Sequence, residues 1–324
     1  MHLNPDTWLS HPTWYITPTA SKDGAGAGGG TLQGRVTCKD CAHQTDPPEI
    51  QKLRQSRFSS GLLACMDLSQ IELRVAALLS GEPFFLNAYL HSFDMHTRSA
   101  AHIVWTEAEI IRRYPSLALI PIDQWAKHSE EFNTKERQVG KTVNFAHLFR
   151  SGAATMQGSV LDMVGELISL STFDKIVRNR STDLPVLWSW QESLIHETHT
   201  QGRLTLPLFG QSRSFLGGEK YEVSEIVNFP VQTTAGNTLL QLQTILHRLI
   251  FAHRLSSSII PFLNVYDALY FDLLNPSLFP VLRDLLAQAL SILCSPLGYW
   301  GLLQSHYGRT VPLSYSLKPL PSPS

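Results

Sequence analysis

The stretch Asp67-Leu68-Ser69-Gln70-Ile71-Glu72-Leu73-Arg74 is the part of this chain that best indicates its fold. It follows an apolar run, Leu62 to Met66, that has the length and composition of a buried strand. A carboxylate at the end of a buried strand is unfavourable unless a partner compensates its charge. A metal ion is the usual partner, so Asp67 is the first candidate for a catalytic residue.

The composition suits a globular protein with a core. The chain has 324 residues, 43% hydrophobic and 16% charged, with a net charge of -1. That balance excludes a surface coated in basic charge, but it is compatible with a local basic groove. Four cysteines in a chain of this length do not indicate a disulfide scaffold, so we expect a reducing compartment. No apolar run of membrane-spanning length and no signal-peptide pattern is seen, so we expect neither secretion nor a membrane partner.

Hydrophobic periodicity predicts a mixture of helices and strands. The predicted helices cover 69–80, 134–149, 234–254 and 278–293, within a helix-rich middle from about 108 to 200. The predicted strands cover 62–67, 259–265 and 269–273, and 204–215 looks extended. Asn133 and Glu136 have the spacing of a capping box at the start of the helix 134–149.

Both ends of the chain have biased composition. The Gly-rich stretch Gly24–Gly30 predicts a flexible loop. A phosphate-binding loop is a weaker alternative, because the Lys-Ser/Thr pair and a clear preceding strand are missing. The tail 317–324 is rich in proline and serine and is predicted to be disordered. Cys38, Cys41 and His43 make half a zinc site at best, and two reduced cysteines are the simpler interpretation.

A second aspartate, Asp267, lies in the predicted tight turn Tyr266-Asp267-Ala268. Two carboxylates at strand ends with apolar flanks could converge on Mg²⁺, which prefers oxygen ligands and retains positions for water and phosphate. Two such ions about 3.5–4 Å apart can hold the attacking and leaving oxygens of phosphoryl transfer. The alternative is that Asp267 is an ordinary solvated turn residue.

Several further segments extend the pattern in a fixed order. They are Gly34-Arg35, Phe93–Arg98, Arg137–Phe145, Asn228–Ala235 and Val265–Ala268. Together with Asp67–Arg74, these segments resemble the motifs of the family A DNA polymerases, the bacterial polymerase I type, over about Gly34 to Leu273.

The resemblance implies an α+β fold: a polymerase palm, with an antiparallel sheet backed by helices, and a helical fingers insertion. The implied segments are a palm lead-in with the Gly-rich loop (1–60), palm with the first aspartate (61–107), fingers (108–225), palm with the second aspartate (226–316) and the disordered tail (317–324). The family's thumb appears absent, which leaves three alternatives. A separate polypeptide supplies the thumb or an exonuclease, the chain is a fragment of a longer gene, or it is a decaying remnant.

The resemblance also implies roles for individual residues. Asp67 and Asp267 would carry two Mg²⁺ ions, helped by the backbone carbonyl of Leu68. Gln70 and Glu72 would contact the nucleotide, Glu72 as a steric gate that leaves no room for a 2′-hydroxyl. The alternative for Glu72 is an exposed helix glutamate.

The fingers segment would bind the deoxynucleoside triphosphate. Arg137, Lys141 and Phe145 recur at four-residue steps and would present two cations and a ring on one helix face. His96 would approach the triphosphate. The alternatives are a solvated basic face with Phe145 in the core, and a core histidine.

Primer–template DNA is the second expected partner. Arg35, Asn228 and Gln232 would contact the minor groove near the growing end, where the acceptors are similar for all base pairs. The expected function is therefore a template-directed DNA polymerase acting wherever the cell or phage replicates DNA, in the cytoplasm.

The sequence departs from the family's pattern in two motifs. The family usually has His before and Glu after the second aspartate, where this chain has Tyr266 and Ala268. Its fingers motif usually ends in Tyr-Gly, where this chain has Phe149-Arg150. The turn Tyr266-Asp267-Ala268 and the missing thumb support the alternative of a catalytically weak or inactive primer–template-binding remnant.

Overall fold

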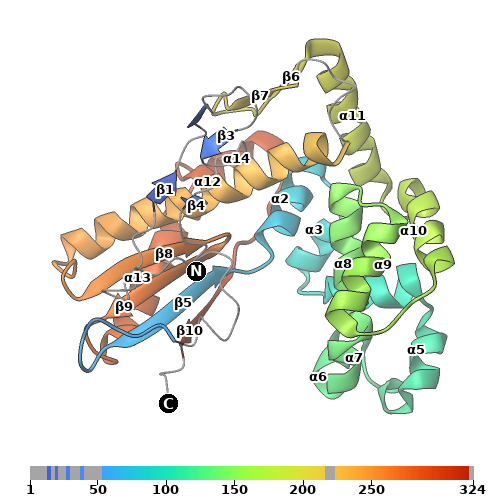
Figure 1. The fold of residues 1–324 in the computed structure, drawn as a ribbon, viewed down its shortest axis with the longest axis horizontal. Coiled ribbons are helices and arrows are strands. Elements are labelled where there is room, and N and C mark those ends of the chain that lie inside the picture. The colour runs from blue at the N-terminus through green and yellow to red at the C-terminus, as the bar shows by residue number, and fades with distance from the viewer. Residues whose placement is uncertain are drawn as a thin grey trace. The chain divides into compact units, whose positions relative to one another are not determined.

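The strand that carries Asp67 belongs to a four-stranded antiparallel sheet with the order β10-β5-β9-β8 (Figure 1). The computed structural model describes residues 53–215 and 223–320, together with the backbone of four short N-terminal strands. The strands of the sheet are β5 (Leu62–Leu68), β8 (Ile259–Val265), β9 (Ala268–Leu273) and β10 (Tyr315–Pro319). The α+β class expected from the sequence is confirmed.

Alternation along β5 separates a covered face from a more accessible one. Ala64, Met66 and Leu68 are at most 1% exposed, whereas Cys65 and Asp67 are only partly buried. Successive side chains of a strand point to opposite faces, so one face of the sheet can be apolar while the other carries polar groups. Asp67 therefore ends a core strand without lying in the core itself.

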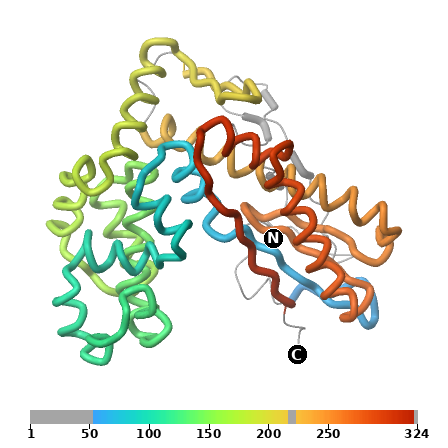
Figure 2. Tube along the Cα trace, turned by 180° about the vertical axis from the view of Figure 1, so that it is seen from behind, coloured from blue at the N-terminus to red at the C-terminus, as the bar shows by residue number. Residues whose placement is uncertain are grey.

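Two helices lie between β9 and β10 in the chain, α13 (Leu278–Cys294) and α14 (Tyr299–Tyr307). Figures 1 and 2 show α13 lying along one face of the sheet, and its buried residues are Leu282, Leu285, Leu286, Ala289 and Leu293. These positions recur every three or four residues, as the amphipathic pattern predicts.

The segment Leu278–Tyr307 is by length and composition apolar enough to cross a membrane, in contrast to the expectation from the sequence. The structure divides it into α13 and α14, with Ser295–Gly298 between them. The core helix of a soluble protein passes the same test of length and composition, so the finding is weak support for a membrane span.

The chain forms two compact units. The palm unit contains Met1–Ile71, Gln232–Gly308 and Leu313–Ser324, and the helical unit contains Glu72–Val231 and Arg309–Pro312. The predicted palm segment 61–107 thus divides at Ile71, because the helices from Pro83 onward pack with the helical unit. The helix α2 (Ile71–Ser80) follows β5, close to the predicted range 69–80.

The helical unit is built mainly from short helices. They are α3 (Pro83–Leu90), α4 (Met95–Ser99), the π-helix η1 (Ala100–Val104), α5 (Glu107–Arg113), η2 (Pro115–Leu117), η3 (Ile122–Gln124), α6 (Trp125–His128), α7 (Glu130–Thr134), α8 (Glu136–Phe149), α9 (Ala153–Val164), α10 (Leu170–Asp183) and α11 (Pro185–Gln201). A hairpin of β6 (Arg203–Thr205) and β7 (Ser212–Ser214) follows. The core beneath α8 contains Val139, Val143 and Ala146, packed with Met156 and Phe173.

Helix α12 (Val223–Ala252) is longer than the predicted helix 234–254, because it continues through Pro230. A proline inside a helix removes one backbone hydrogen bond and usually bends or ends the helix. The neighbours Val227, Phe229 and Val231 are at most 2% exposed, so burial of apolar side chains compensates for the lost bond.

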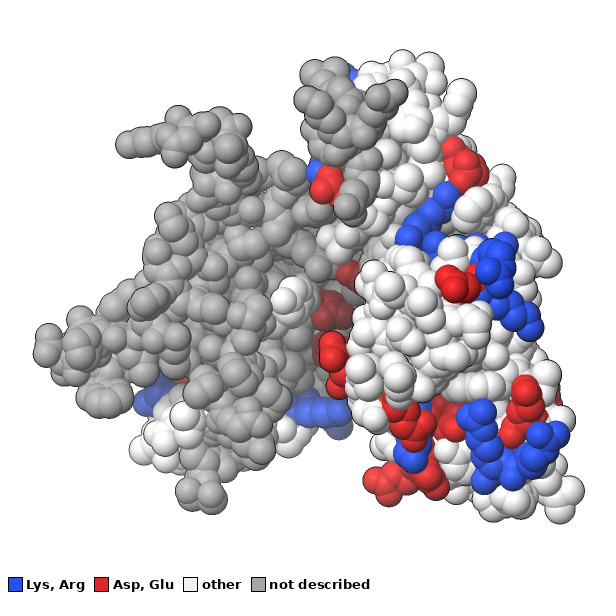
Figure 3. All heavy atoms as spheres, turned by 45° about the vertical axis from the view of Figure 1, so that its right-hand side comes forward, with Lys and Arg blue, Asp and Glu red and all other residues white. Residues whose placement is uncertain are grey.

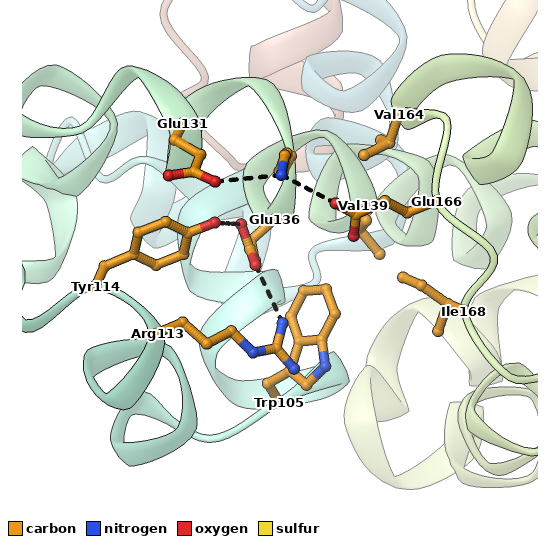
Figure 4. Close-up of a pocket in the computed structure, with 10 residues that line it drawn as sticks. Trp105, Arg113, Tyr114, Glu131, Glu136, Val139, Val164, Glu166 and Ile168 are labelled. Atoms are coloured by element: carbon orange, nitrogen blue, oxygen red, sulfur yellow. Dashed lines mark hydrogen bonds and ion pairs between the residues drawn. The ribbon is translucent and has the colours of Figure 1, made fainter.

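The predicted capping box of Asn133 and Glu136 is wrong. Asn133 lies within α7, and α8 begins at Glu136. Lys135 is the N-cap residue of α8, and its side chain makes no capping hydrogen bond. Figure 4 shows why Glu136 is unavailable: its carboxylate accepts from Arg113 Nη1 at 3.1 Å and from Tyr114 Oη at 2.6 Å. Tertiary contacts have replaced the local contact that the spacing suggested.

The prediction of a disordered tail from residue 317 is wrong for 317–320. The strand β10 pairs with β5, and the amide of Leu320 donates to the carbonyl of Leu63 at 2.8 Å. Proline is tolerated on an edge strand, which explains how a proline-rich segment joins the sheet. The residues 321–324 lie outside the described part of the chain.

The Gly-rich stretch is only partly described. Its residues Ala27–Gly29 form the strand β3, which pairs with β2 (Thr19–Ala20), so this part is not a loop. Two further short strands, β1 (Thr13–Tyr15) and β4 (Thr37–Lys39), pair with each other. Arg35, the side chain of Cys38, Cys41 and His43 lie outside the described residues.

Candidate active site

The two aspartates lie next to each other on the palm sheet. Asp67 pairs with Ala268 in the register of β5 and β9, and the amide of Leu68 donates to the carbonyl of Asp267 at 3.0 Å. Paired residues on neighbouring strands have Cα atoms about 4.5–5.5 Å apart. Two aspartates separated by 200 positions in the sequence therefore lie together at one end of the neighbouring strands β5 and β9.

Cys65 and Asp67 lie two positions apart on β5, so their side chains lie on the same face of the sheet. Burial is the largest cause of the raised pKa of the Cys65 thiol, and a hydrogen bond with Tyr270 opposes the shift. The negative charges of Asp67 and Asp267 raise the same pKa further. Like charges disfavour ionisation only at short range, so the two acids form a local anionic centre.

This pair of acids fits Mg²⁺. No group of three or more His, Cys, Asp and Glu side chains that could hold a metal occurs in the part of the chain that the structure describes. Mg²⁺ commonly binds one or two carboxylates and completes its shell with water and substrate phosphates, so the pair is sufficient. The carbonyl of Leu68 as a third ligand stays a prediction.

The residues on either side of Asp267 have different surroundings. Tyr266 adopts a left-handed φ of 53° and is 54% exposed at the tip of the hairpin. Ala268 is 7% exposed and packs in a small cluster with Leu263 and Tyr270. Because Ala268 pairs with Asp67, a glutamate at this position would bring a third carboxylate to the site.

The turn after Asp67 leads into the predicted nucleotide residues. The amide of Ser69 donates to the carbonyl of Ser314 at 2.9 Å, and Gln70 takes a left-handed φ of 55°. Non-glycine residues in this conformation are uncommon and cluster at functional sites. Glu72 then lies in the first turn of α2, half-buried rather than fully exposed.

Helix α8 presents the predicted nucleotide-binding face. Arg137, Lys141 and Phe145 are each half-buried, whereas Val139 and Val143 on the other face are at most 1% exposed. Phe145 is therefore less buried than the core valines of the same helix. Its ring stacks with Phe149, with centroids 6.2 Å apart and planes at 26°.

A groove runs along this face between α8 and α9. Its volume is about 200 Å³, and the residues that line it include Lys141, Phe145, Phe149, Thr155 and Met163. One cation and two rings among its lining residues suit a ligand with a phosphate and a planar base.

Arg137 is held by an acid of the same unit. Its Nε donates to Asp94 Oδ2 at 2.7 Å, and Asp94 also caps α4 by accepting from Thr97. Burial alone would raise the pKa of Asp94, but the bonds to Arg137 and Thr97 lower it below its usual value. The ion pair between Arg137 and Asp94 holds the guanidinium at the N-terminus of α4.

His96 is 2% exposed, so the alternative of a core histidine describes its burial correctly. Burial, followed by the positive charge of Arg137, lowers its pKa to about 3. The ring is therefore neutral at physiological pH. Its Nδ1 lies 3.0 Å from Nδ2 of Asn144 on α8.

Gly140 explains how α4 comes so close to α8. A Cβ at this position would lie 2.1 Å from the carbonyl oxygen of His96 and 2.8 Å from the amide nitrogen of Ala100. Glycine inside a helix costs about 1 kcal/mol relative to alanine. Here it is the residue that allows the backbone carrying His96 to pack on α8.

Arg150 ends α8 in a left-handed conformation, with φ 54°. Its guanidinium stacks 3.6 Å above the ring of Trp188 and donates to Gln191 Oε1 at 2.8 Å and Glu192 Oε1 at 2.6 Å. The bulky side chain thus turns away from the groove and joins α8 to α11. The sequence showed the departure at this position but not the direction of the side chain.

Asn228 and Gln232 lie four residues apart on α12 and are both partly exposed. The Oδ1 atom of Asn228 is buried and has no hydrogen-bond partner among the described residues. A buried acceptor without a partner is unfavourable, so it is a candidate for bonding to a ligand. The predicted DNA contact of Arg35 lies outside the described residues.

A second cavity lies on the helical unit and has a volume of about 490 Å³ (Figure 4). Its charged residues pair with one another: Lys135 Nζ lies 3.0 Å from Glu166 and 3.2 Å from Glu131. Figure 3 shows basic and acidic side chains interspersed over this unit. None of the residues that line this cavity was predicted as a site residue.

A sheet that carries an aspartate pair and a helical unit with a groove along α8 are the elements that the resemblance to the polymerases predicts. Comparison with known proteins leads to the same class. The polymerase domain of Pol1 from M. smegmatis, solved in complex with DNA primer-template and dNTP, has a similar fold, with a TM-score of 0.64 and 16% identity. The match covers 93% of this chain and 48% of that chain.

Curated proteins of similar sequence include bacterial DNA polymerases I. The thermostable DNA polymerase I of Thermus filiformis is 26% identical over 250 residues, which are 74% of this chain and 26% of that protein. The DNA polymerase I of Aquifex aeolicus is 25% identical over 182 residues, or 56% of this chain and 27% of that protein. No protein-family model matches the chain. The chain is a divergent relative of the family A DNA polymerases, and it spans about a quarter of the length of these relatives.

Proposed function

We propose that the chain is a template-directed DNA polymerase unit that adds deoxynucleotides to a primer 3′ end. The observation that carries the proposal is the hydrogen bond between the backbones of Leu68 and Asp267. It brings the two aspartates to the same end of β5 and β9. Its proposed substrates are deoxynucleoside triphosphates, and its proposed partner is primer–template DNA. The M. smegmatis polymerase domain, whose fold is similar, was solved with both.

Asp67 and Asp267 would hold two Mg²⁺ ions. When bound, these ions would supply the positive charge that activates the 3′ hydroxyl and stabilises the leaving pyrophosphate. The contribution of the protein is to keep two carboxylates close together on a rigid sheet. Backbone pairing on both sides of β5 provides that rigidity.

The face of α8 would bind the triphosphate and the base. Lys141 and Arg137 would neutralise phosphate charge, and Phe145 would stack on the base or sugar along the groove. His96 would donate a hydrogen bond to the triphosphate, and Gln70 would contact the nucleotide. Glu72 would occupy the space that a 2′-hydroxyl needs. Asn228, Gln232 and Arg35 would contact the minor groove, where their side-chain N–H groups would donate to the acceptors that all base pairs share.

A primer-extension assay with Mg²⁺ and the four deoxynucleotides tests the proposal. The variant is Asp67→Ala, and the matched control is Asp284→Ala, which removes a carboxylate that is 75% exposed on α13 of the same unit. We expect extension by the wild type and the control but not by Asp67→Ala. Equal extension by all three proteins would show that the activity does not come from this site.

The second candidate function is primer–template binding without catalysis. Ala268 favours it, because the position beside Asp67 lacks the carboxylate that the family usually has. A protein of this kind would bind primer–template in a fluorescence anisotropy titration and would extend nothing. Its DNA affinity would be nearly the same in Asp67→Ala, since phosphate contacts supply most of the affinity.

A further inference from the structure

Three buried side chains of the helical unit form a chain of hydrogen bonds that ends at His96. Ser99 Oγ lies 2.7 Å from Asn144 Oδ1, and Asn144 Nδ2 lies 3.0 Å from His96 Nδ1. Ser99 and Asn144 are completely buried, and His96 is 2% exposed. Within a dry interior such bonds are strong and their directions are restricted, because each group must be satisfied by its neighbours.

The chemistry of the groups decides which atom carries each proton. An amide oxygen has no proton, so the Ser99 hydroxyl donates to Asn144. An amide nitrogen is only a donor, so Nδ1 of His96 must be the acceptor. A neutral imidazole has one N–H, which then lies on Nε2.

The charges that face His96 keep the ring neutral. Arg137 and Lys141 approach from α8, and Asp94 lies at the start of α4. Burial and the two cations lower the pKa of His96 to about 3, against the opposing effect of Asp94. A protonated ring would carry a hydrogen on Nδ1 as well. That N–H would face the N–H of Asn144 Nδ2, which cannot accept a hydrogen bond.

We propose that Asn144 is a positioning residue for nucleotide binding, which holds His96 as the neutral Nε2–H tautomer so that Nε2 is a permanent hydrogen-bond donor. The inference rests on the proposed function, in which His96 donates to the triphosphate. A phosphate oxygen only accepts hydrogen bonds, so the other tautomer would present a lone pair to it and weaken binding. Asn144 would act through His96 without touching the nucleotide.

Gly140 and Asn144 cooperate in this arrangement. Both lie on the face of α8 that packs on α4, and only glycine at position 140 allows the carbonyl of His96 to come so close. The short approach places the His96 ring within bonding distance of Asn144. A purely structural role for Asn144 would require the same packing but would be indifferent to the tautomer.

The variant Asn144→Asp separates these roles. It is nearly the same size, but its carboxylate accepts hydrogen bonds and would draw the proton of His96 to Nδ1. The matched control is Gln138→Glu, which makes the same chemical change on α8 at a side chain that bonds to the carbonyl of Asn133 instead. Nitrogen-15 NMR of histidine-labelled full-length protein reports the tautomer directly and needs no catalytic activity.

We expect the His96 signals of the wild type and of Gln138→Glu to show a proton on Nε2 alone, and those of Asn144→Asp to show a proton on Nδ1. The affinity for a deoxynucleoside triphosphate in Mg²⁺ buffer, measured by calorimetry, should fall roughly tenfold to a hundredfold in Asn144→Asp only, as for loss of a hydrogen bond to a charged group. An Nδ1 proton in the wild type would overturn the proposal, even if the variant does not fold.

A tautomer that moves without any change in affinity would overturn the role of Asn144 in nucleotide binding. Failure of the proposed function looks different. If wild-type protein with the Nε2 proton in place bound no triphosphate at all, the nucleotide-binding proposal would be wrong, and with it the role assigned to Asn144. The tautomer measurement would still stand as a property of the fold.

Discussion

The backbone amide of Leu68 and the backbone carbonyl of Asp267 are joined by a hydrogen bond of 3.0 Å. The bond continues the pairing of β5 and β9 by one step beyond Asp67 and Ala268, so it ties the turn of the hairpin to the end of β5. Neither aspartate can move far without breaking the sheet. The geometry of the acidic pair is therefore set by the backbone, and mutations elsewhere should affect it little.

Replacing Gly140 by alanine should destabilise the protein. The new Cβ would lie 2.1 Å from the His96 carbonyl oxygen, and overpacking of this kind costs about 1–3 kcal/mol. The matched control is Gly158→Ala in α9, where no atom lies within 4 Å and the helix should gain up to about 1 kcal/mol. Urea unfolding of both variants tests the pair. The same sign for both changes in stability would contradict the packing argument.

Arg150 should be replaced less harmfully by glycine than by alanine. Both variants lose the stack on Trp188 and the bonds to Gln191 and Glu192. Only glycine also relieves the left-handed backbone, which costs other residues about 1–2 kcal/mol. The midpoint of thermal unfolding should therefore fall in the order wild type, Arg150→Gly, Arg150→Ala. A lower midpoint for glycine than for alanine would argue against a strained backbone at this position.

Acid should destabilise the helical unit through two buried histidines. Burial is the main reason that the pKa values of His96 and His147 are lowered to about 3, whereas an unfolded histidine titrates near 6.5. Between these pH values the unfolded chain binds more protons than the folded chain. The part of the unfolding free energy that these two histidines contribute is therefore fully present above about pH 6.5 and is lost as the pH falls toward 3.

Each histidine should add up to about 1.4 kcal/mol per pH unit to this slope. Urea unfolding at a series of pH values measures it. In His147→Gln the slope of the unfolding free energy against pH should decrease by the contribution of one histidine. The Nε2 atom of His147 is buried with no hydrogen-bond partner among the described residues, so the substitution breaks no hydrogen bond of that atom. A slope that is unchanged in the variant would show that His147 is not held neutral in the folded protein.

A carboxylate introduced at Ala268 should strengthen the metal site. The residue pairs with Asp67, so Ala268→Glu would place a third oxygen donor next to the acidic pair. We expect primer extension to reach half its maximal rate at a several-fold lower Mg²⁺ concentration. Ala268→Gln is the control for the bulk added to the small cluster with Leu263 and Tyr270. Equal Mg²⁺ requirements in the two variants would contradict a metal-linked role for this position.

Local patterns predicted much of this structure because the responsible forces are local. The strand before Asp67, the hairpin around Asp267 and the amphipathic helix of Phe145 follow from alternation, turn chemistry and helical periodicity. The strand β10 was missed, because its partner β5 is about 250 residues away and the tail composition resembles a linker.

The missed parts of the site share the same cause. Asn144, one residue before the predicted Phe145, has no sequence signal of its own, since its bonds to His96 and Ser99 depend on how α4 packs on α8. Arg150 was recognised as unusual, but its bonds to α11 could not be derived from spacing. The Asn133–Glu136 pair had the correct spacing for a cap, and a tertiary contact prevailed.

The central claim is that Asp67 and Asp267 act as one catalytic unit. Single-turnover incorporation of one nucleotide, measured for Asp67→Ala, Asp267→Ala and the double variant, tests it most directly. Residues that act as a unit have strongly non-additive effects, so each single variant should lose nearly all activity and the double variant should be no worse. Separate losses that multiply in the double variant, or a single variant that retains wild-type incorporation, would contradict the account.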